Sequence, residues 1–282
     1  MRKLLLTTLC FYMVACSSTS EVSKDGDAVS ESSVGIDESS VQPSEYDQDG
    51  EDISTSAPVA VSLYTALNEA IKIQNDGAIQ KASTDILTQN PKDIRALNAL
   101  AIFYYKKGRF EAAQFLLMKA IAANNSSSEL YSNLGLVHLA KNDRREAVKS
   151  FRKALELNPQ DAVAAANVGS IYVAEKDFNK AALALEVSIQ KGMRDSKVMN
   201  NYAVALTATG RAKEAGEIYE KILKENPSHR EAMLNYSILL IGTLQKNKEG
   251  LDLLDRLKFV GAPPDSKDTI KSLEIKAKAG LQ

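Results

Sequence analysis

The fold is decided by residues 128–161, which read SELYSNLGLVHLAKNDRREAVKSFRKALELNPQD. Residues of the same kind recur 34 positions away in both directions. The repeated positions are Asn133, Asn167, Asn201 and Asn235, then Ala113, Ala147, Ala181 and Ala215, and at twice the interval Pro91, Pro159 and Pro227. The six frames 60–93, 94–127, 128–161, 162–195, 196–229 and 230–263 follow one another without an insertion. A fixed period of this length indicates a repeat protein whose units pack on their neighbours.

The pattern of residues 128–161 resembles the tetratricopeptide repeat (TPR). The residues that carry the resemblance are Tyr131, Leu134, Gly135, His138, Ala147, Phe151, Ala154 and Pro159; only His138 departs, where Tyr is usual. The resemblance implies two antiparallel helices in each repeat, small residues where their backbones approach, and a proline that ends the second helix. We therefore expect an all-α fold, a right-handed TPR solenoid of about six repeats over residues 61–263.

The two ends of the repeat array fit the pattern less well. The first frame has Leu67 and Ser83 at positions 8 and 24, which are usually a small and a bulky residue. In the last frame, residues such as Gly250 and Leu254 are displaced by one position. After that frame, residues 264–282 are expected to form a C-terminal capping helix, because the ends of a solenoid need a polar outer face and this segment is rich in lysine.

The first residues indicate an export signal. Arg2 and Lys3 precede an apolar run, Leu4 to Val14, which is too short to span a bilayer as a helix. The stretch Met13-Val14-Ala15-Cys16 resembles a bacterial lipobox, which implies removal of residues 1–15 and acylation of Cys16. The alternative is an ordinary signal peptide with an incidental cysteine. Ser17 follows the cysteine, and under the sorting rule of many lipoproteins this predicts an outer-membrane protein facing the periplasm.

Residues 16–60 are acidic and rich in serine. Between Ser17 and Ala60 there are twelve Ser, eleven Asp or Glu and one Lys, a net charge of −10. So few large apolar side chains cannot offset the entropy of ordering, so we expect a disordered tether. Its role is either that of a plain spacer or that of a segment attracted to the solenoid, whose net charge from Val61 onward is +7.

The sequence offers no recognisable catalytic chemistry. Its two cysteines, Cys10 and Cys16, both lie in the signal region, and its two histidines are far apart. His138 occupies a core position of its repeat, and His229 falls between repeats. Phosphate-binding loops and the common hydrolase and zinc motifs are absent from the sequence. We therefore predict a protein that is not an enzyme, has no cofactor or metal, and does not bind nucleic acid, since no basic cluster accompanies the modest positive charge.

A groove is the feature most informative about function. In TPR superhelices the first helix of each repeat lines the concave side, and position 6 of the repeat faces inward. Here that position carries asparagine four times, at Asn133, Asn167, Asn201 and Asn235. An amide both donates and accepts, so such a row can pair with a peptide backbone, as in the asparagine ladder of some peptide-binding TPR superhelices. Asparagine at this position also suits simple capping or hydration of the groove. Ile102 is predicted to face the groove, and five apolar residues of the later frames are predicted to form its floor: Leu136, Leu139, Val173, Val204 and Ile238.

These features predict a lipid-anchored periplasmic scaffold or adaptor whose partners are proteins or peptide segments of an envelope complex. The chain resembles the TPR lipoprotein of the adventurous gliding-motility complex and the type IV pilus pilotins that help secretin subunits reach the outer membrane. The long acidic segment before the repeats favours the gliding-motility group. An adaptor for peptidoglycan hydrolases is a third alternative. The resemblance implies no small-molecule substrate, and the membrane is contacted only through the lipid anchor.

Overall fold

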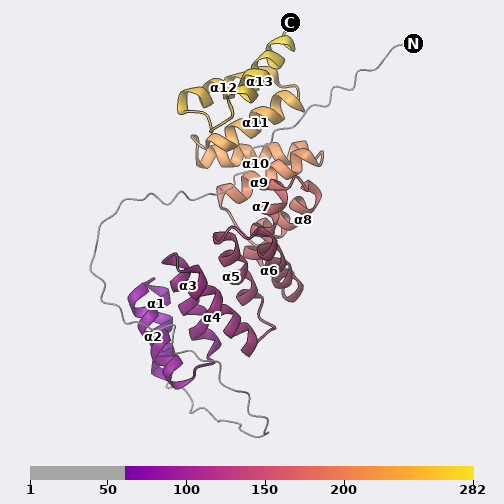
Figure 1. The fold of residues 1–282 in the computed structure, drawn as a ribbon. Helices are drawn as coiled ribbons and strands as arrows, with labels where there is room; N and C mark the ends of the chain where they lie inside the picture. Colours follow the sequence, from indigo (N-terminus) through magenta and orange to yellow (C-terminus); the bar gives the residue numbers. More distant parts are fainter. Residues whose placement is uncertain (1–60) are drawn as a thin grey trace.

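The computed structural model describes residues 61–282, which form thirteen α-helices stacked into an elongated array with α1 at one end and α13 at the other (Figure 1). The expected signal peptide, Cys16 and the expected acidic tether lie outside the described residues. The helices are α1 Val61–Lys72, α2 Asp76–Gln89, α3 Ile94–Lys106, α4 Phe110–Ala123, α5 Ser128–Ala140, α6 Arg144–Leu157, α7 Ala162–Ala174, α8 Phe178–Gln190, α9 Ser196–Ala208, α10 Ala212–Glu225, α11 Arg230–Gly242, α12 Asn247–Val260 and α13 Lys267–Ala279.

The helices alternate between two roles that follow the 34-residue register. The odd-numbered helices α3 to α11 each begin at the first residue of a frame, and the following even-numbered helix completes that repeat. We call them first and second helices. Each second helix packs against its own first helix and against the first helix of the next repeat. The all-helical solenoid expected from the sequence is therefore confirmed over residues 61–282.

A left-handed residue makes the turn inside each repeat. Five turns place it at position 15 of the frame, with φ between 54° and 84° at Gln74, Gly108, Asn142, Lys176 and Gly210. Left-handed backbone suits glycine and asparagine best, because the absence or small size of the side chain removes the clash with the following carbonyl. The last repeat breaks the register. There the left-handed residue is Gln245, which stands at position 16.

Aspartates fix where many helices begin. The side chains of Asp93, Asp161 and Asp195 accept hydrogen bonds from backbone N–H groups in the first turns of α3, α7 and α9. Asp143 and Asp177 do the same for the second helices α6 and α8. An N-cap carboxylate satisfies a donor that has no partner inside the helix and favours the positive end of its dipole. The helix boundaries are thus set locally and repeat with the sequence.

Small residues allow the two helices of a repeat to touch. A Cβ atom added at Gly135 would lie 2.5 Å from the ring of Phe151, and one added at Gly169 would lie 2.6 Å from Leu185. Ala147 and Phe151 are completely buried. In the last repeat the close contact falls at Gly250, where an added Cβ would lie 2.3 Å from Ile241. The one-residue displacement predicted for this repeat is therefore confirmed, and it accompanies the later turn at Gln245.

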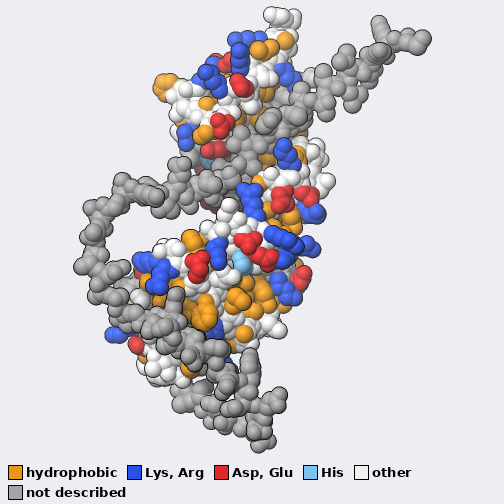
Figure 2. Space-filling view, in the orientation of Figure 1, with side chains coloured by type: hydrophobic (Ala, Val, Ile, Leu, Met, Phe, Trp, Pro, Cys, Tyr) orange, Lys and Arg blue, Asp and Glu red, His pale blue; other side chains and the backbone are white. Residues whose placement is uncertain are grey.

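The apolar core is distributed unequally along the array. One continuous cluster extends from Val173 to Ala277 and includes residues of α7 to α13. The earlier repeats hold three smaller clusters, centred on α1–α3, on α3–α5 and on α6–α7. Helix α13 packs against α11 and α12 and closes the array with Ile270, Leu273 and Ala277. On the face shown in Figure 2, charged side chains are interspersed over all the described repeats.

Within residues 61–282 no helix is both long enough and apolar enough to cross a bilayer. In the same range no group of three or more His, Cys, Asp or Glu side chains is arranged to hold a metal ion.

Candidate functional site

The four asparagines predicted to form a row occupy equivalent places. Asn133, Asn167, Asn201 and Asn235 are each the sixth residue of their first helix, in α5, α7, α9 and α11. Their amide nitrogens are engaged within the solenoid. Asn133 Nδ2 donates to Asn98 Oδ1 at 2.8 Å, and Asn167 Nδ2 donates to Val163 O of its own helix at 2.8 Å. Three of the four asparagines bond to a residue of the preceding repeat, namely Asn133 and, as described next, Asn201 and Asn235.

The bonds of Asn201 and Asn235 are buried. Asn201 Nδ2 donates to Ser170 Oγ at 3.1 Å, and Asn235 Nδ2 donates to Asn200 Oδ1 at 3.2 Å. Both side chains are at most 3% exposed. Position 6 is predicted to face an open groove, but these two asparagines lie inside the packing between repeats. A hydrogen bond in a buried place contributes to holding the repeats together, and removing one partner is costly.

The residues of the predicted apolar floor also differ in exposure between α5 and the later first helices. Leu136 and Leu139, on α5, are partly exposed. Val173, Val204 and Ile238 are buried at 2%, 0% and 7% exposure and belong to the large core cluster. The sequence could not separate the two groups, because both the exposed and the buried group contain residues from position 9 and from position 12 of the repeat. As described, the structure leaves only the α5 members of this set in partial contact with solvent.

An open cavity lies instead over the first repeats. It has a volume of about 440 Å³ and is lined by α1, α3, the start of α2 and the start of α5. Ile71 and Ile102 contribute apolar side chains that are 45% and 36% exposed. Asn98, Arg95 and Lys106 supply polar groups along the same helix, α3. An apolar surface with a few convergent polar groups is the usual composition of a ligand-binding cleft.

Neighbouring side chains fix the polar groups of this cavity. Arg95 lies over the Tyr64 ring, 5.1 Å from its centroid. Tyr64 Oη donates to Asp93 Oδ2 at 2.5 Å, and this hydrogen bond raises the pKa of Tyr64. At the other side, Asn98 Nδ2 donates to Glu129 Oε1 at 2.8 Å. The cavity therefore presents a positioned guanidinium and a chain of amide and carboxylate groups beside its apolar floor.

Lys106 and Lys107 lie at the C-terminal end of α3. Both approach Asp76, with Nζ to carboxylate distances of 3.9 and 3.0 Å. These side chains are between one third and one half exposed, so the pairs orient charge more than they stabilise the fold. Sequence reasoning placed Ile102 on the groove but missed Ile71, Arg95 and Lys106. The first frame matches the repeat pattern poorly, so it gave no reliable register for Ile71.

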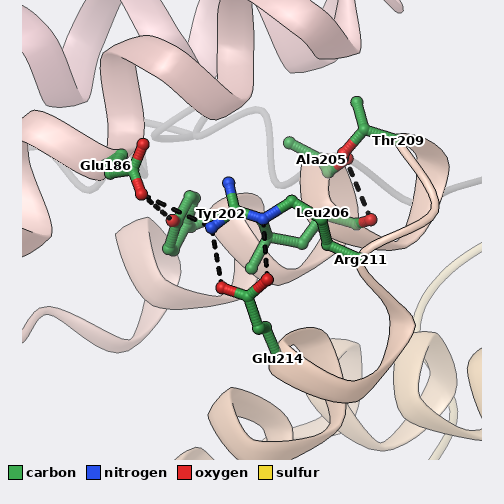
Figure 3. Close-up of polar contacts among 7 residues, drawn as sticks. All are labelled: Glu186, Tyr202, Ala205, Leu206, Thr209, Arg211 and Glu214. Carbon is green, nitrogen blue, oxygen red and sulfur yellow. Dashed lines mark hydrogen bonds and ion pairs between the residues drawn. The ribbon is translucent and has the colours of Figure 1, made fainter.

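A polar network in the later repeats has a structural role. Tyr202 Oη donates to Glu186 Oε1 at 3.2 Å, and Arg211 Nη2 lies 3.4 Å from the same oxygen (Figure 3). Arg211 also binds Glu214 in a bidentate pair at 2.8 and 2.7 Å. Burial raises the pKa of Tyr202, and the hydrogen bond from Arg211 lowers the pKa of the Glu214 carboxyl. The network joins α8, α9 and α10.

The same tyrosine contact recurs one repeat later. Tyr236 Oη donates to Glu220 Oε1 at 2.7 Å, and the sequence separation matches that of Tyr202 and Glu186. Recurrence in the repeat register indicates that the contact joins repeats and does not form a reactive centre. The remaining Thr209 hydroxyl in Figure 3 donates to the α9 carbonyl oxygens of Ala205 and Leu206 at the helix end.

The histidines are structural as well. His138 is buried, as expected for a core position, and burial lowers its pKa. His229 lies between repeats, as predicted, and is the N-cap of α11, where its Nδ1 accepts from Ala232 N at 3.3 Å.

Comparison with known families identifies the repeats. Models described as tetratricopeptide repeat match residues 74–134, 128–161 and 196–229. The fold is a TPR solenoid. None of these matches indicates a catalytic family, and TPR repeats generally serve protein–protein interaction. No curated protein matches the chain.

Solved structures show the same TPR solenoid. YrrB, described as a TPR protein with an unusual peptide-binding site, is 20% identical with a TM-score of 0.60, and the match covers 71% of this chain and 99% of YrrB. A tetratricopeptide repeat protein from Parabacteroides merdae is 14% identical with a TM-score of 0.52, covering 79% and 91%. Pseudomonas aeruginosa pilF is 20% identical with a TM-score of 0.49, covering 67% and 90%. At these identities the likeness concerns the fold alone.

Proposed function

We propose that this TPR solenoid is a scaffold that holds an extended segment of a partner protein against the first helices of its early repeats. The observation that carries the proposal is the open cavity lined by α1, α3 and α5, in which Ile71 and Ile102 remain exposed beside fixed polar groups. Exposed apolar side chains that gather in a polar-rimmed cleft favour a binding surface. YrrB is described as having a peptide-binding site, and a peptide segment is the ligand class proposed for this chain.

The contacts suggest how such a segment is held. An apolar side chain of the partner packs against Ile71 and Ile102, and this burial supplies most of the affinity. The guanidinium of Arg95 favours an acidic residue in the partner, because Arg pairs with carboxylates in a bidentate way. Asn98 and Asn133 are partly exposed and linked to each other, so their remaining donors and acceptors are placed for the main chain of the bound segment.

A pair of matched variants tests this cavity. Ile102→Asp places a charge on the cavity floor at a side chain that is already 36% exposed, so the fold is expected to survive. Phe259→Asp makes the same kind of change on α12, outside the cavity, at a side chain that is 94% exposed. Crosslinking and capture from envelopes should lose the main partner with the first variant and keep it with the second. Equal capture by both would remove the cavity from the proposal.

We further propose that acyl chains on Cys16 anchor the scaffold in the outer membrane, facing the periplasm. The support is the lipobox-like sequence that ends at Cys16 and the serine that follows it. Several acyl chains on one residue anchor stably, whereas one chain alone is marginal. Cys16→Ser should release the protein from membranes or leave it unprocessed. Palmitate labelling that persists in this variant would contradict the anchor.

Among envelope machines, we propose that the scaffold serves gliding motility. The support is the length of the acidic segment before an uninterrupted array of repeats, and this is an analogy with a family and not a physical argument. The alternatives are assembly of type IV pilus secretins and recruitment of peptidoglycan hydrolases. The partner that depends on Ile102 in the capture experiment decides among them, because each machine offers a different set of proteins.

A further inference from the structure

The second helices form a face of their own, with an uneven chemistry. The repeat register puts Phe115, Lys149 and Leu183 at position 22 of three successive repeats, on α4, α6 and α8. Met118 and Arg152 stand at position 25 of the first two. The apolar members are unusually open to solvent, since Phe115, Met118 and Leu183 are 61%, 55% and 68% exposed. Equivalent positions of a solenoid point the same way, so α6 presents cations between two exposed apolar neighbours.

Helix α6 is the basic element of this face. It carries five Lys or Arg and two Asp or Glu in fourteen residues. Lys149 and Lys153 are paired with Glu146 and Glu156 on the same helix. The side chains of Arg145 and Arg152 are exposed and make no hydrogen bond or ion pair with another described residue. Figure 2 shows Lys and Arg side chains at the level of α6 and α8, with Asp and Glu side chains beside them.

We propose that this face, defined as Phe115, Met118, Arg145, Lys149, Arg152 and Leu183, binds the surface of a bilayer that contains anionic phospholipids. Guanidinium groups pair with phosphates in a bidentate way and are less strongly hydrated than ammonium groups. Exposed Phe, Met and Leu side chains beside them enter the boundary between headgroups and acyl chains, as in interfacial helices. The cations of this outward face therefore match the anionic headgroups of a lipid surface, and its apolar side chains match the boundary with the acyl chains.

Chain length supports a membrane as the occupant. This inference rests on the proposed anchor at Cys16. The 44 residues from Ser17 to Ala60 cannot extend beyond about 150 Å, so an anchored solenoid stays near the bilayer. Tethering replaces a bimolecular encounter by an intramolecular one at high effective concentration. Weak electrostatic binding by this face is then sufficient to set the orientation of the solenoid on the bilayer. With the second helices on the lipid, the cavity lined by the first helices α1, α3 and α5 remains accessible to a partner.

Vesicle binding by the full chain carrying Cys16→Ser tests the face without any acyl chain. Sedimentation is compared between pure phosphatidylcholine vesicles and vesicles with 30% phosphatidylglycerol, roughly the anionic content that gives a marked surface potential. We expect binding that requires the anionic lipid and falls with added salt. The triple variant Arg145→Gln, Lys149→Gln and Arg152→Gln should weaken it at least tenfold, and Phe115→Ser with Leu183→Ser should weaken it severalfold.

A control of equal charge keeps the test specific. Lys213, Lys221 and Lys224 are exposed on the second helix α10, and changing all three to Gln removes the same charge outside the face. This control should retain nearly full binding, and circular dichroism should show that every variant is folded. Equal losses for the α6 and α10 triple variants would overturn the proposal. So would a chain that binds no vesicle but binds poly-glutamate through Arg145, Lys149 and Arg152, because the face would then belong to an acidic protein segment. Neither outcome depends on acylation of Cys16 or on the cavity at Ile102.

Discussion

The repeats before α7 and those from α7 onward share one sequence register but differ in how many residues of their first helices are buried. Helix α5 buries five of its thirteen residues, whereas α9 buries nine consecutive residues, Met199–Thr207, and α11 buries ten, Ala232–Ile241. Two small apolar clusters lie within α1 to α5 and a third joins α6 to α7, whereas a single large cluster extends from Val173 at the end of α7 to α13. The difference teaches that a TPR pattern specifies the pairing of helices but leaves the exposure of the first-helix face to the residues between the consensus positions.

Tyrosines account for part of this difference. Position 7 carries Tyr202 and Tyr236 in the last two repeats, Val168 in the α7–α8 repeat and Leu134 in the α5–α6 repeat. Each tyrosine reaches a glutamate of the preceding repeat, and the Tyr236 ring stacks on Tyr219 with 5.5 Å between ring centroids. Large rings fill the gap between repeats and also satisfy their hydroxyl groups. The later repeats are therefore expected to be the stable end of the molecule, and the early repeats the open end.

The largest expected effect comes from burying a charge at either end. Ala113 and Ala215 are completely buried at the same repeat position, one in a small cluster and one in the large cluster. Changing either to Asp should cost about 3 kcal/mol or more of unfolding free energy, because the carboxylate has no partner there. Hydrogen exchange should show Ala215→Asp loosening α7 to α13 together. Ala113→Asp should loosen mainly α1 to α5, and equal loosening of α9 to α12 would contradict the division into two ends.

Glycine substitutions should have opposite signs at the two ends. Gly135→Ala puts a methyl group 2.5 Å from the buried Phe151 ring, and overpacking should cost about 1–3 kcal/mol in urea unfolding. Adding Phe151→Leu should recover part of that loss. Gly216, inside α10, has no atom closer than 3.9 Å to an added Cβ. Gly216→Ala should therefore stabilise by about 0.5–1 kcal/mol, because alanine loses less backbone entropy in a helix. A destabilising Gly216→Ala would show that the space beside it is not available.

Two asparagine variants compare the later and the early repeats through smaller changes in unfolding free energy. Asn235→Ala removes a buried bond and leaves Asn200 Oδ1 without it, which should cost about 1–3 kcal/mol. Asn133→Ala removes the corresponding bond to Asn98 in a partly exposed place, where water replaces the lost partner. Its cost should be about 0.5–1.5 kcal/mol. Chemical denaturation of both variants measures the difference, and equal costs would indicate that the two bonds are equally desolvated.

The smallest effect is a pH dependence in the early repeats. Burial lowers the pKa of His138 in the folded protein, so the unfolded chain binds more protons as the pH falls below about 6.5. The contribution of neutral His138 is therefore fully present above that pH and is lost on acidification toward its folded pKa. The melting temperature should fall modestly between pH 7.5 and 5.5. His138→Gln should flatten that slope, and an unchanged slope would assign the pH dependence to other groups.

Much of the fold could be predicted from the sequence because TPR contacts are local and periodic. The helix pairs, the close contacts at Gly135 and Gly169, and the one-residue displacement in the last repeat all follow from identities at fixed positions. Exposure could not be predicted in the same way. Asn133 and Asn235 occupy the same repeat position, yet one is partly exposed and the other is fully buried. The two helices have different neighbours, because α11 also packs against α13, which lies outside the six repeat frames.

The candidate site was predictable only in part for a related reason. The sequence identified the first-helix face and Ile102, but the cavity also needs Ile71 and the start of α2. These residues belong to the first frame, whose Leu67 and Ser83 depart from the pattern. An end repeat has a neighbour on one side only, so its sequence is under different packing demands. The register therefore gives the least information where the structure places the open cavity.

The late turn at Gln245 has a consequence for how such a chain changes length. Between Ile94 and Pro227 every unit has the same spacing and the same turn position, so an additional copy of 34 residues inserted at a frame boundary meets matching surfaces on both sides. The α11–α12 unit differs, because its turn stands one residue later and its α12 packs against α13, which lies outside the 34-residue frames. Tandem duplication of whole frames between Ile94 and Pro227 can therefore lengthen the molecule with matching surfaces, whereas a copy of the α11–α12 unit would bring a displaced turn into the array.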